Sequence, residues 1–257
     1  MIEKIFGNYA EYYDLLNSDK DYVSETRYHE QIFASFPSKI RSILELGSGT
    51  GSHVVNLHEA GYKVLGVDIS EDMVRLGKAK LHNAGIDEVD ANIIVGDIRS
   101  IDLTKTFDLV LSSFHVMSYM VTNQDLIDAF STARRHLEVG GYFVFDFWFT
   151  PGVKNIRATS RTKILSNNEI SVTRTAEPLH IDQLNCIDIQ YFFKVTNLKD
   201  FKTISFNEIH RMRHLEISEV VDLCSDNFEL VAVFGENTFE RPTQDNWSAL
   251  AALRRIK

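Results

Sequence analysis

Short apolar runs alternate with longer amphipathic stretches between Ile43 and Phe149, and this alternation most constrains the fold. The apolar runs are rich in β-branched and aromatic residues, which favour strands, whereas the stretches between them have helical spacing. Alternating strands and helices predict a doubly wound, mostly parallel α/β sheet of about seven strands, with helices on both faces. We expect its first strands over residues 42–46, 63–68, 91–95, 107–112 and 142–147.

The alternation stops after Pro151, where apolar and β-branched segments follow one another without intervening helices. This pattern predicts an inserted antiparallel β subdomain, and the chain returns to the α/β pattern near its C-terminus. The expected organisation is an N-terminal helical lid (1–40), a ligand-binding α/β core (41–150), the inserted antiparallel β subdomain (151–214) and the C-terminal part of the core (215–257).

Composition excludes several classes of protein. The 257 residues are 44% hydrophobic and 25% charged, as a globular protein requires, and the net charge of −9 disfavours nucleic acid as a partner. Cys186 and Cys224 have no metal-binding or disulfide-like spacing, the nine histidines are dispersed, and no apolar run could cross a membrane. We therefore expect a cytoplasmic protein with reduced thiols, without a metal and without a membrane partner.

A glycine-rich turn follows the first strand and contains Gly47, Gly49 and Gly51. Glycines at this point let the backbone turn tightly and approach a ligand at the carboxyl edge of the sheet. The dinucleotide fingerprint would have a glycine where this chain has Ser52, and the lysine of a phosphate-binding loop is missing. Glu45, inside the preceding strand, instead suits a ligand with an amino-acid moiety that carries an ammonium group.

Two further acids follow the next two strands. Asp68 lies about twenty residues beyond the first glycine, where a carboxylate binds the two hydroxyls of a ribose; Ser70 is the better helix cap. Asp97 could accept a hydrogen bond from an adenine amino group while Ile98 packs on the ring, although it could also be only a turn residue. Three acids at the ends of successive strands around one crevice point to S-adenosylmethionine.

The segments Glu45-Leu-Gly-Ser-Gly-Thr-Gly, Gly66-Val-Asp-Ile-Ser, Gly96-Asp-Ile and Leu137-Glu-Val-Gly-Gly-Tyr-Phe-Val-Phe-Asp together resemble class I S-adenosylmethionine-dependent methyltransferases. This resemblance covers roughly the first 150 residues in order. A narrower one, carried by Tyr9-Ala-Glu-Tyr-Tyr-Asp and Phe145-Asp-Phe-Trp, is to bacterial small-molecule methyltransferases of nucleotide-linked aminosugars and surface polysaccharides. It implies methyl transfer to nitrogen or oxygen of a small polar acceptor, expected to be a sugar or nucleotide-linked metabolite of surface-polysaccharide synthesis.

The residues expected to bind the cofactor lie at the ends of the first four strands, and one N-terminal tyrosine joins them. They are Tyr13, Glu45, Gly47, Ser48, Gly49, Asp68, Ile69, Met73, Asp97, Ile98 and Ser113. The N-terminal segment could act as a lid over the ligand or pack as an ordinary helix on the sheet edge.

His115 and Tyr119 are the candidate catalytic residues, because they follow the fourth strand and carry groups that can accept a proton. In the aminosugar enzymes a histidine occupies the place that Tyr119 takes here, and His115 could supply an imidazole from nearby. Either residue could also be purely structural. The candidate substrate-binding residues are Tyr9, Trp148, Arg211 and Arg213, and the two arginines could instead lie solvated on an edge strand.

Other functions remain open at this point. The acceptor could be a phosphorylated or amino-acid-like metabolite, or the chain could be a regulatory protein that binds S-adenosylmethionine without turnover. An NAD(P)-dependent oxidoreductase is disfavoured by Ser52 and Glu45. Exposed strands of the insertion could pair across a two-fold axis to form a homodimer.

Overall fold

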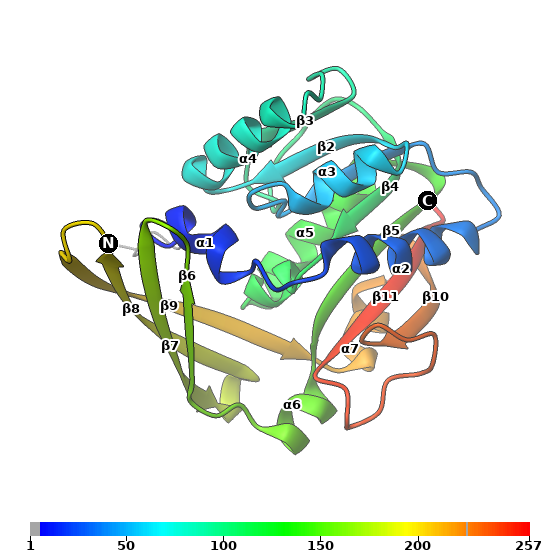
Figure 1. Cartoon of the computed structure of the whole chain (residues 1–257). Helices are drawn as coiled ribbons and strands as arrows, with labels where there is room; N and C mark the ends of the chain where they lie inside the picture. The colour runs from blue at the N-terminus through cyan, green and yellow to red at the C-terminus, as the bar shows by residue number, and fades with distance from the viewer. Residues whose placement is uncertain (1–5, 225) are drawn as a thin grey trace.

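Five parallel strands form the centre of the fold in the computed structural model, which describes residues 6–224 and 226–257 (Figure 1). They are β1 (Ser42–Leu46), β2 (Lys63–Asp68), β3 (Ala91–Val95), β4 (Phe107–Ser112) and β5 (Leu137–Phe149). Their order is β3-β2-β1-β4-β5, and β11 (Ser248–Arg255) and β10 (Phe228–Gly235) extend the sheet antiparallel beyond β5. The predicted seven-stranded doubly wound core is confirmed.

The strand order reverses direction at β1, because β2 pairs with one side of β1 and β4 with the other. The connection from β1 to β2 and the connection from β4 to β5 therefore lead away from each other. This change of direction leaves a crevice outside the carboxyl ends of β1 and β4. The fold therefore places the glycine turn after β1 at the position where open α/β sheets bind ligands.

Helices cover both faces of the core sheet. Both faces are apolar, because successive apolar side chains of β5 point to opposite faces. Tyr142 and Val144 pack on the face covered by α2 (Tyr22–Ala34), α3 (Ser52–Glu59) and α4 (Glu71–Asn83). Phe143, Phe145 and Phe147 pack on the other face, below α5 (Asn123–Arg135) and α7 (Ile217–Cys224). Each helix thus buries one apolar stripe against the strands.

Four antiparallel strands follow the short helix α6 (Thr150–Ile156) and form the expected insertion. They are β6 (Arg161–Ser166), β7 (Ile170–Ile181), β8 (Cys186–Asn197) and β9 (Thr203–Leu215), with the 3-10 turn η2 (Asp182–Leu184) between β7 and β8. The insertion is not a separate sheet, because β9 pairs with the end of β5 through Trp148 with His214 and Phe149 with Leu215. The strands make one sheet of eleven.

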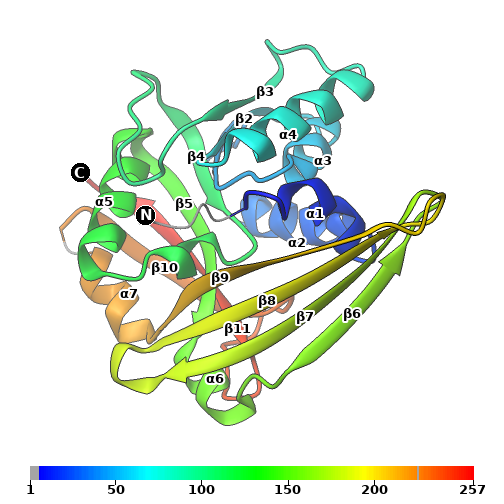
Figure 2. The same cartoon turned by 90° about the vertical axis from the view of Figure 1, so that its left-hand side faces the viewer.

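Helix α1 (Ala10–Leu16) lies between the inserted sheet and the core (Figure 2). Tyr9 and Leu16 are buried against Val172, Phe193 and Val195 of β7 and β8. Residues 1–5 of the expected N-terminal lid lie outside the described residues. No helix in the described ranges is long and apolar enough to span a membrane.

Candidate functional site

The glycine turn after β1 adopts a backbone that other residues rarely take. Gly47 and Gly51 have φ of +78° and +74°, and a Cβ on either would come within 2.4 Å of Val116 or Ile93 respectively. The N–H groups of Gly47 and Ser48 both donate to the Val67 carbonyl, at 2.7 and 3.0 Å. The turn is thus attached to β2 and held close to the loop that follows β4.

Replacing Gly51 by alanine should lower the free energy of unfolding by about 2 kcal/mol, half from the left-handed backbone and half from the collision with Ile93. Gly85 is the matched control, because its φ is +69° and a Cβ there would meet nothing within 4 Å. Gly85→Ala should therefore cost only about 1 kcal/mol in urea denaturation. Equal losses in the two variants would show that the contact with Ile93 contributes nothing.

Asp68 ends β2 with its carboxylate fixed in place. Its Oδ2 accepts the N–H of Gly49 at 2.8 Å and its Oδ1 accepts the N–H of Ser70 at 2.9 Å. Burial raises the pKa of Asp68, and these two donors oppose the rise. Ser70 caps α4 by accepting the N–H of Met73, so Asp68 is free of that role. Each carboxylate oxygen keeps a lone pair with which to accept a ribose hydroxyl.

Three buried oxygen atoms around the crevice have no hydrogen-bond partner among the described residues: Glu45 Oε2, Ser48 Oγ and Ser113 Oγ. They lie on β1, in the glycine turn and directly after β4. Buried polar groups are normally satisfied, so three orphaned atoms at one edge of the sheet indicate a ligand. A carboxylate and two hydroxyls fit the ammonium and carboxylate of an amino-acid moiety, as the predicted cofactor requires.

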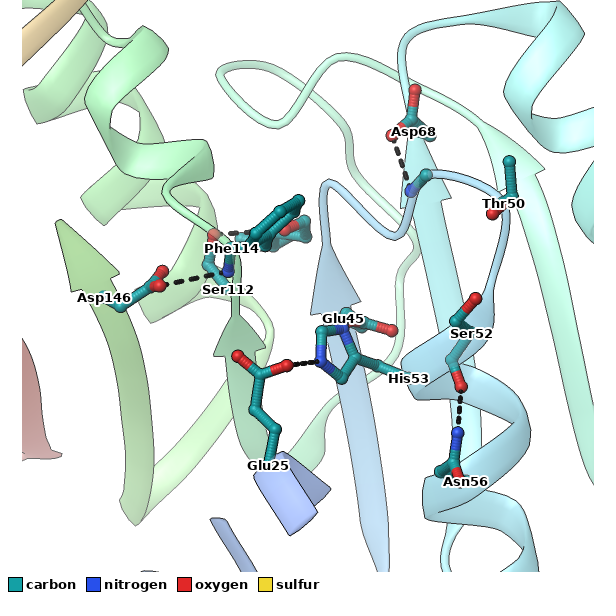
Figure 3. A network of polar contacts seen from close by, with 12 residues as sticks. Glu25, Glu45, Thr50, Ser52, His53, Asn56, Asp68, Ser112, Phe114 and Asp146 are labelled. Atoms are coloured by element: carbon teal, nitrogen blue, oxygen red, sulfur yellow. Dashed lines mark hydrogen bonds and ion pairs between the residues drawn. The ribbon is translucent and has the colours of Figure 1, made fainter. Parts of the chain in front are cut away.

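Glu45 belongs to a buried charge network that the sequence did not reveal (Figure 3). His53 of α3 lies between two carboxylates, with Nε2 2.8 Å from Glu25 of α2 and Nδ1 3.4 Å from Glu45. Burial disfavours the imidazolium, but the two carboxylates outweigh it and raise the pKa of His53 to about 9. The pKa of Glu25 lies well below its usual value, because His53 and Lys20 outweigh its burial. Helix α2 is thereby tied to the crevice.

The remaining predicted cofactor residues have different surroundings. Tyr13 is partly buried, and burial raises its pKa well above the usual value, with smaller contributions from Tyr22, Tyr9, Tyr119 and Asp68. Ile98 is buried, Ile69 is 60% exposed, and Met73 is a buried residue in the first turn of α4.

Asp97 is held by a neighbouring cation. Arg99 binds both of its carboxylate oxygens, with Nε 3.0 Å from Oδ1 and Nη2 2.6 Å from Oδ2, and the same guanidinium contacts Asp125. The hydrogen bond lowers the pKa of Asp97. Binding of an adenine amino group by Asp97 stays a prediction, and it has to use the lone pairs that Arg99 leaves.

His115 and Tyr119 lie in the loop after β4, which Asp146 of β5 organises. The Asp146 carboxylate accepts the N–H groups of Phe114 and His115 at 3.1 and 2.8 Å, and lies 3.1 Å from His115 Nδ1. Burial opposes protonation of His115, but Asp146 outweighs it and raises the pKa of His115. Tyr119 ends the 3-10 turn η1 (Val116–Tyr119), and its hydroxyl contacts His210 Nδ1 at 2.8 Å.

A profile of the methyltransferase-domain family matches residues 43–141, the stretch that holds the glycine turn, Asp68 and His115. This stretch is a methyltransferase domain, and the chain has the fold of the class I S-adenosylmethionine-dependent methyltransferases. Its cofactor is S-adenosylmethionine, as predicted. The crevice residues Glu45, Ser48, Asp68 and Ser113 are the groups that would hold it.

Relatives of this methyltransferase include the dTDP-3-amino-3,4,6-trideoxy-alpha-D-glucopyranose N,N-dimethyltransferase of Streptomyces venezuelae, 30% identical over 146 residues. That alignment covers 56% of this chain and 59% of the relative. A putative methyltransferase of Bacillus subtilis, YqeM, is 28% identical. The alignment covers 93% of this chain and 92% of the YqeM chain. The X-ray structure of the sugar N-methyltransferase KedS8 from Streptoalloteichus superposes with a TM-score of 0.79 at 19% identity, covering 96% of this chain and 92% of that one.

Helix α1 of the methyltransferase is joined to the glycine turn by hydrogen bonds and an ion pair of Asp14. The Asp14 carboxylate accepts the Thr50 hydroxyl at 2.6 Å and the Lys80 ammonium at 3.0 Å, and Lys80 also donates to Thr50 and Ser52. These contacts join α1, the glycine turn and α4, and a lid function of α1 over the cofactor stays a prediction.

Replacing Asp14 by asparagine should speed the dissociation of S-adenosylhomocysteine about threefold, because a half-exposed ion pair contributes less than about 1 kcal/mol. Stopped-flow dissociation measurements would test this. Glu11→Gln is the matched control. Glu11 lies on the same helix as Asp14 and pairs with Arg75 of α4 at an exposed site. An unchanged rate in Asp14→Asn would show that α1 does not restrain the cofactor.

The predicted substrate-binding residues of the methyltransferase do not all face the crevice. Tyr9 and Trp148 are buried, and Trp148 packs 6.3 Å from the His115 ring. Arg211 and Arg213 lie on the face of β9 opposite to His210, because side chains alternate along a strand. Their guanidinium groups bind Asp188 at 2.6 and 2.7 Å and Glu219 at 2.8 Å. We therefore assign these arginines to ion pairs within the chain.

A cavity of about 800 Å³ opens beside His115, between α2, the loops after β4 and β10, and the start of β11. Its walls carry cations and anions, among them Lys20, Arg27, Lys163, Asp146 and Glu236. None of its cationic residues was predicted from the sequence, because they come from α2, the segment before it and β6. No cluster of metal-ligating side chains occurs in the described part of the chain.

Proposed function

We propose that this methyltransferase transfers a methyl group to nitrogen or oxygen of a sugar carried on a nucleotide, in surface-polysaccharide synthesis. The cavity beside His115 carries the proposal. Its volume of about 800 Å³ accommodates a ligand larger than a single sugar, and its mixed charges suit an acceptor with phosphate and amino groups. Similarity to a nucleotide-aminosugar N,N-dimethyltransferase supports the same class of acceptor.

The cavity supplies groups for both halves of such an acceptor. Arg27 provides positive charge for phosphate oxygens, and Lys20 and Lys163 add to it while they are paired with Glu25 and Asp19. Asp146 and Glu236, which also line the cavity, provide negative charge for an amino group. Asp146 faces His115 Nδ1, so the free Nε2 of His115 is the ring nitrogen available to the acceptor.

Methyl transfer from a sulfonium is a displacement that depends on alignment more than on covalent help. S-adenosylmethionine, when bound, supplies the activated methyl group. The protein's part is to hold the acceptor in line with it, to exclude water and to take up the proton that the acceptor loses. In this proposal His115 holds the acceptor, and its contact with Asp146 fixes the orientation of the ring.

The acceptor is tested by incubating the purified protein and S-adenosylmethionine with a dTDP-linked 3-amino sugar, the matching 3-hydroxy sugar or a phosphorylated amino acid. Mass spectrometry detects added methyl groups, and calorimetry with S-adenosylhomocysteine and NAD reports the cofactor site separately. We expect methylation of a nucleotide sugar. Product from the phosphorylated amino acid alone would favour the alternative metabolite, and tight cofactor binding without any product would favour a regulatory binding protein.

A further inference from the structure

A chain of three polar side chains runs from the loop after β4 into the inserted sheet. The Tyr119 hydroxyl lies 2.8 Å from His210 Nδ1, and His210 Nε2 lies 3.1 Å from Glu208 Oε2. His210 is 1% exposed and Glu208 is buried beside it on β9. One phenol, one imidazole and one carboxylate are thus joined by consecutive hydrogen bonds.

Aromatic rings enclose this chain of groups. Phe6, Tyr9 and Tyr191 surround His210, with ring centroids at 4.8, 5.9 and 5.0 Å. Glu208 also accepts the backbone N–H groups of Phe6 and Tyr9, at 3.0 and 3.1 Å. The enclosure removes water from these hydrogen bonds, and a hydrogen bond is electrostatically stronger in such surroundings.

The titratable and charged groups that face His210 are Tyr119 of η1, Glu208 of β9, Tyr191 of β8 and Tyr9 of the N-terminal segment. Arg174 of β7 stands one step further away, where it donates to the Tyr9 hydroxyl at 3.2 Å and lies over the Tyr191 ring. Glu208 is the carboxylate that contacts the imidazole directly.

Tyr119 sits at the cofactor crevice. It ends the turn whose first residue, Val116, packs against Gly47 of the glycine turn. Burial raises the pKa of Tyr119 well above its usual value, and Tyr191, Tyr9, Glu208 and Asp68 act in the same direction. The phenol therefore stays protonated, and it can take up a proton only by passing its own to a neighbour.

We infer that Tyr119, His210 and Glu208 form a relay that takes up the proton lost by the methyl acceptor. The inference rests on the proposed function. As the new bond forms between the acceptor atom and the methyl carbon, the carbon–sulfur bond breaks and its electron pair stays on sulfur. The acceptor proton moves to the Tyr119 oxygen, and the proton already there moves to His210 Nδ1. The resulting imidazolium is stabilised by Glu208, to which Nε2 donates.

Tyr119 is the catalytic residue in this scheme, and His210 and Glu208 are positioning residues. Glu208 accepts from Nε2 and so selects the tautomer that leaves Nδ1 free to accept the Tyr119 proton. The relay works only while His210 is neutral.

The kinetic test uses the dTDP-linked 3-amino sugar as acceptor. His210→Phe keeps the packing of the ring and should lower kcat about 100-fold, with KM and the affinity for S-adenosylhomocysteine changed less than about twofold. Tyr119→Phe should have the same effect and the double variant no larger one, because the two residues act as a unit.

His214→Gln is the matched control, since His214 is a second buried histidine on β9 that contacts the Thr150 hydroxyl instead. Its kcat should stay near that of the wild type. Retained kcat in His210→Phe, or losses that multiply in the double variant, would overturn the relay.

A second measurement does not depend on the acceptor. Nitrogen NMR of labelled protein with S-adenosylhomocysteine should show His210 neutral at pH 8, with Nε2 protonated and Nδ1 unprotonated. An imidazolium at pH 8 would overturn the relay. If the wild type methylates no member of the acceptor panel, the proposed acceptor fails, and the NMR result alone decides whether the relay exists.

Discussion

Replacing Asp68 by asparagine is expected to weaken the binding of S-adenosylhomocysteine about 100-fold, or about 2.7 kcal/mol. The carboxylate is fixed by the N–H groups of Gly49 and Ser70, so it presents two charged acceptors to the ribose hydroxyls without reorganising. Hydrogen bonds to charged groups are worth about 1.5–3 kcal/mol. The amide keeps the shape of the side chain but replaces one acceptor by a donor, which faces either a hydroxyl or a backbone N–H.

Titration calorimetry measures this affinity directly. Asp90→Asn is the matched control, because Asp90 lies just before β3, far from the carboxyl edge, and is paired only loosely with Lys63 at 3.9 Å. The control should bind with the affinity of the wild type. A change of less than about threefold in Asp68→Asn would show that this carboxylate does not bind the ribose.

The stability of the protein should fall by about 3 kcal/mol between pH 6.5 and pH 9 because of His53. Its pKa rises from an ordinary 6.5 to about 9 in the folded chain, and each unit corresponds to 1.36 kcal/mol. The folded state therefore binds a proton in this window that the unfolded state has released. The contribution is fully present below pH 6.5 and is lost as the pH rises through about 9.

Urea denaturation at a series of pH values would measure this dependence. His53→Gln removes the titrating group, so the difference between wild type and variant isolates His53 from His115, whose pKa is also raised. The variant should lose stability at pH 6.5 and little at pH 9. Parallel curves for the two proteins would mean that His53 is not a buried imidazolium between Glu25 and Glu45.

Local sequence patterns predicted the core fold and part of the crevice well. The strands over 42–46 and 91–95, the cap at Ser70 and the glycine turn are local features, because each depends on residues close together in the chain. Apolar alternation along one strand or helix is enough to define them.

Contacts between distant segments were not predictable in this way. Glu25 meets His53 and Tyr119 meets His210 across 28 and 91 positions, and no spacing rule connects them. Alternation along β9 does separate His210 from Arg211, but which face turns toward the crevice depends on the pairing of β9 with β5. The contact between Tyr119 and His210 on the proposed acceptor side of the site therefore became visible only in the three-dimensional structure.

The junction between the core and the inserted sheet separates the cofactor crevice from two residues of the proposed proton relay. In the described residues, β9 is joined to β5 by two residue pairs, at Trp148 and Phe149, whereas β11 pairs with β5 at seven positions and β4 at five. The residues of the cofactor crevice lie at the ends of the core strands, whereas His210 and Glu208 lie on β9, on the other side of this junction. Substitutions in the inserted sheet can thus change the groups of the proposed relay while the cofactor crevice on the core strands is left unaltered.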